Sequence, residues 1–185
     1  SNRGGKTCTA SAEVAMCALH RHYITDKYHK DDVRIACIGA DGKHLALMFE
    51  YLFEKPPYKI FMHPDTKKWT VVIPDQHRQY KHLWEDADPL IPQRYLHGGS
   101  FKTAVLWESE KGHIPKEVRL NNGTIIRFYS ALGKIPKGIK FDLIWIDEEI
   151  ERAGRWIKEM QARIIDRNGY ILWSATPQLA GQDFF

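Results

Sequence analysis

Residues 141–149, FDLIWIDEE, decide the fold class of this chain. Apart from Asp142, the first six residues are apolar, and they are rich in β-branched and aromatic types. A run this short and this apolar predicts a strand buried on both faces, as in a parallel sheet with helices above and below.

Three carboxylates follow that strand directly: Asp147, Glu148 and Glu149. Neighbouring carboxylates repel one another by roughly 4 kcal/mol at 4 Å and an effective dielectric near 20, so the cluster needs a cation or solvent. Because side chains alternate along a strand, Asp147 can hold a metal ion while Glu148 points elsewhere and polarises a water molecule. Glu149 fits better as an acidic helix start.

The amino end, SNRGGKT, predicts a phosphate-binding loop. Gly5-Lys6-Thr7 fits the end of the motif G-x-x-x-x-G-K-[ST], whose first glycine would fall one residue before Ser1. The triplet alone occurs by chance in about one chain in ten of this length, so the acidic strand end and the helical pattern after Thr7 are needed to support it.

In such a loop the lysine reaches the β- and γ-phosphates of ATP, the hydroxyl residue ligates Mg²⁺ and backbone amides hold the remaining oxygens. Lys6 and Thr7 take the first two roles. The rest of the predicted loop consists of Ser1, Asn2, Arg3, Gly4 and Gly5. A glycine-rich helix start without a ligand is the competing interpretation.

Length and composition indicate a globular domain. The 185 residues fit one domain or most of one, and 43% hydrophobic and 27% charged residues are ordinary values. No apolar run of about 18 residues and no signal-peptide pattern occur, which predicts neither a membrane span nor secretion. The formal net charge of +4 permits nucleic-acid binding without requiring it.

The cysteines and histidines show no metal-ligand spacing. Cys8, Cys17 and Cys37 are an odd number, which favours reduced core thiols over a disulfide or a zinc site. The histidines, among them His20, His22 and His29, are interpreted as surface residues.

Strand and helix patterns alternate along the chain. Helices are expected at 7–22, after an Asp41 cap up to Pro56, and at 153–164 with a left-handed cap at Asn168-Gly169. Strands are expected at 33–39, 102–107 and 170–173, and hairpins at 58–73 and 117–127, the second around Asn122-Gly123. The pattern predicts an α/β fold with a mainly parallel central sheet flanked by helices and a β-hairpin insertion.

Three motifs occur in this order: SNRGGKT, IWIDEE about 140 residues later, and SATP. In these motifs the chain resembles the N-terminal ATPase domain of the large terminase subunit, the motor that packages DNA into tailed-phage capsids. The resemblance covers the whole chain. It implies an additional-strand, RecA-like P-loop NTPase that uses ATP and Mg²⁺ and acts as a homo-oligomeric ring on double-stranded DNA. It further implies the portal and the small terminase subunit as partners, in the cytoplasm of an infected bacterium.

The same resemblance implies residue roles. Arg3 is the arginine within the loop, Asp147 the metal-holding acid and Glu148 the catalytic carboxylate. Ser174-Ala175-Thr176 is the motif that couples hydrolysis to movement, although spacing alone fits Ser174 and Thr176 as caps at a strand end.

The chain departs from the family pattern in two ways. Where the family often has arginine-glycine before the acidic strand, this chain has Lys137-Gly138, so Lys137 is the candidate trans-acting residue. Family members also carry a nuclease domain that has no counterpart here. Residues 1–185 are therefore expected to be a motor domain that is incomplete at both ends.

Two other functions fit parts of the pattern. A helicase ATPase of the DEAD-like group also carries Ser-Ala-Thr after an acidic motif. The second is a non-catalytic DNA-binding module with a vestigial phosphate loop, which would need neither bound ATP nor a catalytic carboxylate.

Overall fold

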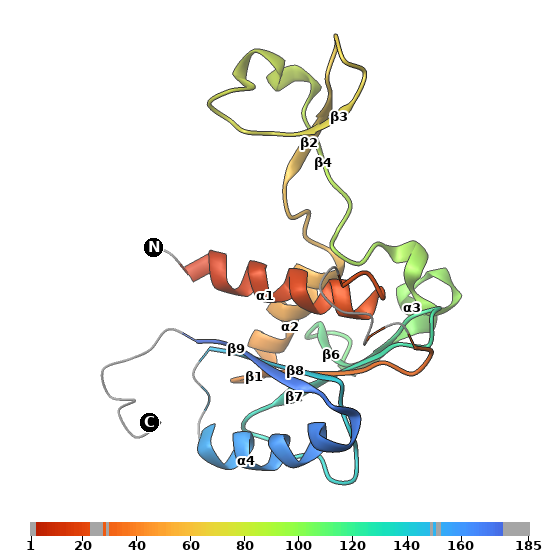
Figure 1. Ribbon diagram of the computed structural model, residues 1–185, viewed down its shortest axis with the longest axis vertical. Coiled ribbons are helices and arrows are strands. Elements are labelled where there is room, and N and C mark those ends of the chain that lie inside the picture. The colour runs from red at the N-terminus through yellow and green to blue at the C-terminus, as the bar shows by residue number, and fades with distance from the viewer. Residues whose placement is uncertain (1–2, 23–27, 29, 149, 151–152, 176–185) are drawn as a thin grey trace.

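A computed structural model describes residues 3–22, 28, 30–148, 150 and 153–175 (Figure 1). Its centre is a six-stranded sheet in the order β5-β6-β7-β1-β8-β9, with helices on both faces. The predicted α/β class with a mainly parallel sheet is confirmed.

Four of the strands run parallel: β1 (Arg34–Gly39), β7 (Ile125–Ser130), β8 (Leu143–Asp147) and β9 (Tyr170–Ser174). Two antiparallel strands extend the sheet beyond β7, namely β5 (Val105–Ser109) and β6 (Ile114–Arg119). Because parallel strands point the same way, the carboxyl ends of β7, β1, β8 and β9 share one edge of the sheet. The acidic end of β8 lies at that edge.

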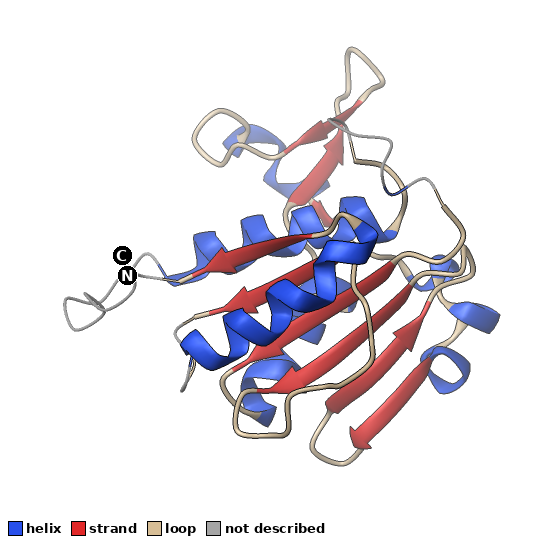
Figure 2. Cartoon of the chain, turned by 60° about the horizontal axis from the view of Figure 1, so that its bottom comes forward, coloured by secondary structure: helices blue, strands red, loops and turns tan. Residues whose placement is uncertain are grey.

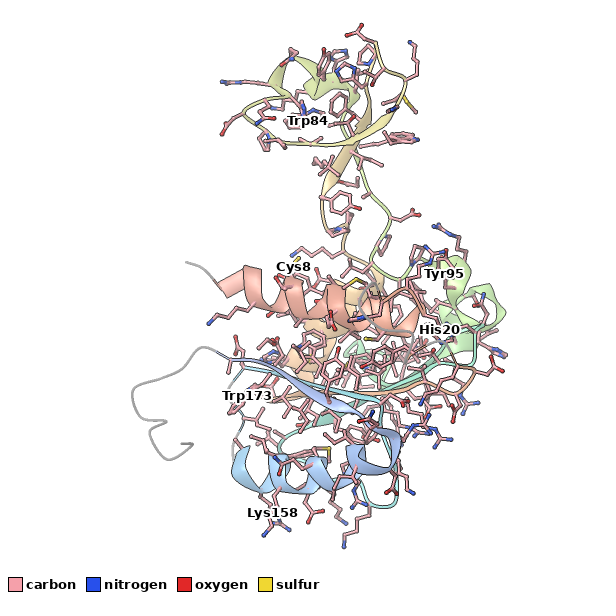
Figure 3. The ribbon with its side chains drawn as sticks, viewed as in Figure 1. Cys8, His20, Trp84, Tyr95, Lys158 and Trp173 are labelled. Atoms are coloured by element: carbon pink, nitrogen blue, oxygen red, sulfur yellow. The ribbon has the colours of Figure 1, made fainter. Side chains whose placement is uncertain are left out.

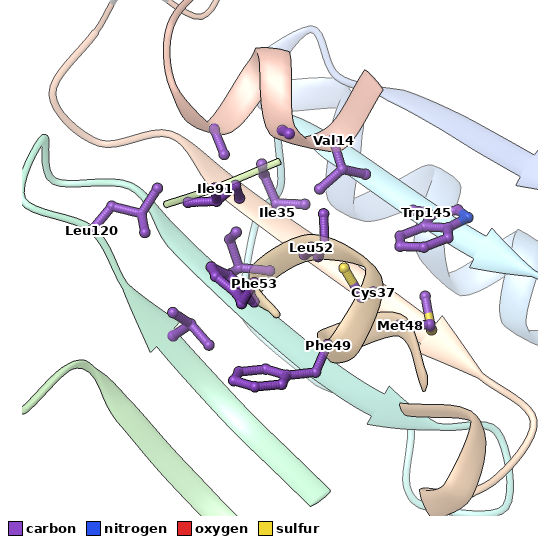
Figure 4. Close-up of a cluster of buried hydrophobic side chains, with 14 of the residues drawn as sticks. Val14, Ile35, Cys37, Met48, Phe49, Leu52, Phe53, Ile91, Leu120 and Trp145 are labelled. Carbon is purple, nitrogen blue, oxygen red and sulfur yellow. The ribbon is translucent and has the colours of Figure 1, made fainter. Parts of the chain in front are cut away.

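Helices α1 (Arg3–Ala18) and α2 (Gly42–Phe53) cover one face of the sheet, and α4 (Ala153–Ile164) covers the other (Figures 1 and 2). Strand β8 shows why both faces are needed. Trp145 is buried in the cluster beneath α1 and α2 (Figure 4), whereas Ile144 and Ile146 are buried in the cluster beneath α4. The predicted double burial of this strand is confirmed.

A second sheet, in the order β3-β2-β4, projects from the body of the molecule after α2 (Figure 1). It consists of β2 (Lys59–Met62), β3 (Trp69–Val71) and β4 (Glu85–Asp86), and the 3-10 helix η2 (Arg78–Leu83) adjoins it. Phe61 is buried on one face, where it stacks on Tyr80 with ring centroids 5.2 Å apart. The other face leaves Trp69 58% exposed. The predicted hairpin insertion is confirmed.

Several local predictions also hold. Asp41 caps α2 by accepting a hydrogen bond from the His44 amide at 2.9 Å. Gly123 turns the β6–β7 hairpin with φ of 86°, and a Cβ there would lie 1.9 Å from the Asp31 carbonyl oxygen, so the turn requires glycine. After α4 and η5 (Ile165–Arg167), the left-handed residue is Asn168 with φ of 51°.

Two element boundaries were predicted wrongly. Helix α1 spans residues 3–18 instead of 7–22, because His20 is left-handed with φ of 58° and the Arg21 amide bonds back to the Met16 carbonyl at 2.8 Å. Thr124 Oγ1 and Asn122 Nδ2 donate to the Ala18 carbonyl that this end leaves open, at 3.0 and 2.8 Å. Residues 101–104 form the short helix α3 (Phe101–Ala104) rather than a strand. There, Thr103 Oγ1 donates to the His97 and Ser100 carbonyls. The remaining 3-10 helices are η3 (Gln93–Tyr95) and η4 (His97–Gly99).

Asp142, just before β8, is fully buried and fastens that end of the strand. Its carboxylate accepts hydrogen bonds from Lys30 Nζ at 2.5 Å, the Arg34 amide at 2.8 Å and Arg167 Nε at 3.0 Å. Burial alone would raise the pKa of Asp142, but the bonds from Arg167 and Lys30 outweigh it and hold the pKa below its usual value.

We expect Arg167→Met to lower the free energy of unfolding by about 1–3 kcal/mol, because the buried Asp142 carboxylate loses one of three donors and Asp32 loses the bonds that Arg167 donates to its side chain and carbonyl. A lowered pKa in the folded state adds stability above about pH 4 that is lost as the pH falls further. The deficit of the variant should therefore shrink below about pH 4, which urea unfolding across pH would measure. Arg94→Met, which removes an exposed ion pair with Asp88, should lower the free energy of unfolding by less than about 1 kcal/mol. Equal losses in the two variants would contradict the stabilising role of the bond between Arg167 and Asp142.

Candidate active site

Asp147 ends β8 as a fully buried carboxylate that three side chains contact. Thr7 Oγ1 donates to it, 3.1 Å from Oδ2 and 3.3 Å from Oδ1. Ser174 Oγ donates to Oδ1, and His44 Nε2 lies 2.9 Å from Oδ2. The three contacts come from β9, α1 and α2, so this carboxylate is the point where these elements meet.

The topology explains the convergence. The parallel register of β8 and β9 sets Asp147 opposite Ser174. Helix α1 lies over these two strands and carries Thr7 near its start, while α2 follows the carboxyl end of β1 and carries His44 in its first turn. Every contributor therefore belongs to the same edge of the sheet.

Lys6, the residue before Thr7 in α1, adds a cation at the end of β9. Its Nζ donates to the Ala175 carbonyl at 3.2 Å, and the side chain lines an open groove of about 620 Å³ between α1 and β9. Trp173, which also lines the groove, is labelled in Figure 3. The first amides of a helix have no partner within the helix and carry partial positive charge, so the start of α1 offers donors to an anion here.

The predicted loop at residues 1–7 differs in its backbone. Arg3, Gly4 and Gly5 belong to the first turn of α1 instead of an open loop, and the Gly5 carbonyl already accepts a bond from Thr9 Oγ1 at 2.9 Å. Only the backbone of Arg3 and Gly4 is described, and Ser1 and Asn2 lie outside the described residues. The structure thus shows the Lys6 and Thr7 end of the motif at Asp147.

Glu148 differs from Asp147 in exposure. Its side chain is 61% exposed, and its φ of 62° turns the chain sharply out of β8. Positive φ is uncommon for residues other than glycine and is often found at functional sites. The carbonyl of Glu148 accepts a bond from Trp173 Nε1 at 3.0 Å. The two carboxylates thus differ in burial but share one neighbour, because His44 Nδ1 lies 3.9 Å from Glu148 Oε2 while its Nε2 contacts Asp147.

The Ser-Ala-Thr segment touches the site at two points. Ser174 Oγ donates to Asp147 and accepts a bond from Trp145 Nε1 at 2.8 Å, and the Ala175 carbonyl binds Lys6. Thr176 and Glu149 lie outside the described residues.

Lys137 is not brought to Asp147 in the described part of the chain. It is exposed and lines a separate open groove of about 820 Å³, together with Lys134 and Arg155 and beside Trp156 of α4. The groove presents three cationic side chains to its surroundings.

The interpretation of the histidines as surface residues is wrong for His44 and His22. The side chain of His44 is only 11% exposed, and its bond to Asp147 raises its pKa in spite of burial, which acts the other way. The side chain of His22 is 6% exposed and pairs with Glu13. The sequence did offer a signal for His44. It lies three positions after the capping residue Asp41, which directly follows a buried strand, and this places it at the carboxyl edge of the sheet.

The donor set suits the ligands that the sequence predicted. The Thr7 hydroxyl and the Asp147 carboxylate are hard oxygen donors, which Mg²⁺ prefers. Lys6 and the start of α1 suit a phosphate. Thr7 and Asp147, which contact each other, are thus the residues that could hold Mg²⁺, and Lys6 with the start of α1 those that could hold a phosphate.

In comparisons with known proteins, no family model and no curated protein matches this chain. Among the helices that the structure describes, none has the length and apolar character needed to cross a membrane. The site geometry therefore carries the functional argument.

We expect His44→Ala to lower the free energy of unfolding by about 1–3 kcal/mol, because the buried Asp147 carboxylate loses a donor. His44→Gln, which keeps an N–H donor at a similar reach, should lose less. Urea unfolding measures both. His82→Ala, at an exposed histidine of η2, is the control and should stay within about 0.5 kcal/mol of the parent protein. A loss in His44→Ala no larger than that in His82→Ala would show that Asp147 does not depend on His44.

Proposed function

We propose that this chain is a Mg²⁺-dependent ATPase that drives double-stranded DNA into a viral capsid, as the ATPase domain of a large terminase subunit. The observation that supports the proposal most is the contact between Thr7 and Asp147, which are 140 positions apart in the sequence. They meet at the carboxyl edge of a largely parallel sheet, where open α/β sheets bind their ligands.

The residues divide the binding work. Lys6 and the first amides of α1 would hold the phosphates, together with the rest of residues 1–7, including Arg3. Thr7 and Asp147 would hold Mg²⁺. Bound Mg²⁺-ATP supplies a γ-phosphoryl group whose developing charge is neutralised by the ion.

Glu148 would act on the attacking water. Its exposed carboxylate is an acceptor for a proton of that water, and it sits one residue from the metal-holding acid. Positioned carboxylates of this kind contribute about 10²–10⁴ in rate. His44 would keep Asp147 in place, since its imidazole bonds to an oxygen of that carboxylate.

Coupling to movement would run through residues 174–176. Ser174 bonds to Asp147 and Ala175 bonds to Lys6, so a change in the phosphates at Lys6 reaches the end of β9 directly. The substrate that is moved would be double-stranded DNA, held by a homo-oligomeric ring of this chain. The portal and the small terminase subunit would be the assembly partners. Lys137, exposed on its own groove, would act on the nucleotide of a neighbouring copy.

Glu148→Gln should lower ATP turnover by about 10²–10⁴ while Mg²⁺-ATP still raises the melting temperature. The amide keeps the shape of the side chain and loses its basicity, so binding persists. A phosphate-release assay with linear duplex DNA measures turnover, and Glu110→Gln, at an exposed position in the turn between β5 and β6, is the matched control.

Unchanged turnover in Glu148→Gln would contradict the role of this carboxylate. Absence of any Mg²⁺-ATP stabilisation, expected at about 2.7 kcal/mol for a hundredfold excess over Kd, would favour a non-catalytic DNA-binding module. ATP-dependent strand separation by the parent protein would favour a helicase, because a packaging motor moves duplex DNA without opening it.

The role of Lys137 has its own test. Lys6→Ala copies lack a phosphate lysine but retain Lys137, whereas Lys137→Ala copies have the opposite defect. Each variant alone should be nearly inactive, and a mixture should recover part of the turnover as mixed rings form. A mixture no more active than the sum of its parts would show that Lys137 does not act between copies.

A further inference from the structure

We propose that Glu13, Cys17 and His22 form a binding site for a divalent transition metal ion, with Zn²⁺ the preferred occupant. The three residues lie at the far end of α1 from Lys6 and Thr7. The proposal does not depend on the ATPase assignment.

The geometry is close to that of a metal site. One ligand atom from each residue lies within 4.8 Å of the other two, and His22 Nε2 is 2.7 Å from Glu13 Oε1. Tetrahedral zinc, with bonds of about 2.0–2.3 Å, holds its ligand atoms roughly 3.3–3.7 Å apart. Side-chain shifts of about 1 Å would therefore bring the three atoms into place without moving the helix.

The local sequence accounts for the convergence. Glu13 and Cys17 are four residues apart on one face of α1. After the helix ends at Ala18, the backbone turns back, with the Arg21 amide bonded to the Met16 carbonyl at 2.8 Å, and this turn returns His22 to the same face. The spacing E-x₃-C-x₄-H is not that of a standard zinc motif, because His22 reaches the other two residues only through the turn after Ala18.

The chemistry favours zinc over magnesium. Cys17 is fully buried, the side chain of His22 is 6% exposed and that of Glu13 24% exposed, so the site is largely shielded from water. Thiolate and imidazole are ligands for zinc and related metals, whereas magnesium prefers oxygen donors and water. This site is therefore chemically distinct from the one at Asp147.

Tyr170 adjoins the ligand atoms of Glu13 and Cys17. Its hydroxyl donates to Glu13 Oε1 and lies 3.7 Å from Cys17 Sγ. Because Tyr170 begins β9, a bound ion would hold the end of α1 close to that strand.

Cobalt is the probe for this site. Metal-free protein should bind one equivalent of Co²⁺ with a thiolate-to-cobalt charge-transfer band in the near ultraviolet, and added Zn²⁺ should abolish the band. Cys17→Ser should lose the band, whereas Cys8→Ser, at a half-buried cysteine early in the same helix (Figure 3), should keep it. Glu13→Gln, which keeps an oxygen acceptor, should bind Co²⁺ about tenfold or more weakly.

Circular dichroism of each variant separates lost ligands from lost folding, and Glu13→Gln supplies the answer if Cys17→Ser does not fold. A band of equal strength in Cys17→Ser and Cys8→Ser would overturn the proposal. So would the absence of stoichiometric cobalt in the parent protein, or unchanged affinity in Glu13→Gln. The cluster would then be a hydrogen-bonded network only, in which Glu13 accepts from Tyr170 and pairs with His22.

Discussion

The burial of the Asp147 carboxylate is the constraint on which the rest of this structure depends. A buried carboxylate without hydrogen bonds is costly, so its surroundings must supply donors. Here they come from Thr7, His44 and Ser174, on three elements that are distant in sequence. Satisfying one side chain thereby fixes how the start of α1, the start of α2 and the end of β9 meet at the edge of the sheet.

The two ends of β8 use buried carboxylates in opposite ways. Asp142 is bonded to Lys30 and Arg167, so its charge is compensated and its role is to hold the fold together. Asp147 is bonded to two hydroxyl groups and one imidazole, and no lysine or arginine among the described residues bonds to it. Hydroxyl donors do not neutralise charge, so of these three contacts His44 alone, whose pKa the bond to Asp147 raises, can compensate the carboxylate, and its ring also lies 3.9 Å from Glu148.

Sequence patterns predicted the features that depend on interactions between neighbouring residues. The double burial of β8, the Asp41 cap and the turn at Gly123 each follow from a few neighbouring residues, and each is confirmed. Two features escaped prediction for different reasons. The end of α1 is local, but its left-handed residue is His20 instead of the usual glycine or asparagine, so the residue types did not mark it. His44 is drawn from the surface by a carboxylate 103 positions away, a partner that is not visible in the spacing around it.

Helix α1 and strand β9 are joined at both ends, which limits how the site can move. Near the start of α1, Lys6 bonds to Ala175; near its end, Glu13 accepts a bond from Tyr170. A helix rises about 1.5 Å per residue, so these two attachments are roughly 10 Å apart along α1. If Ala175 moves, two outcomes are possible. Either α1 and β9 move together, or the bond between Lys6 and Ala175 breaks and α1 rotates relative to β9 about the bond between Glu13 and Tyr170. Phosphate binding by Lys6 would favour the second course, because the lysine cannot bond fully to both partners.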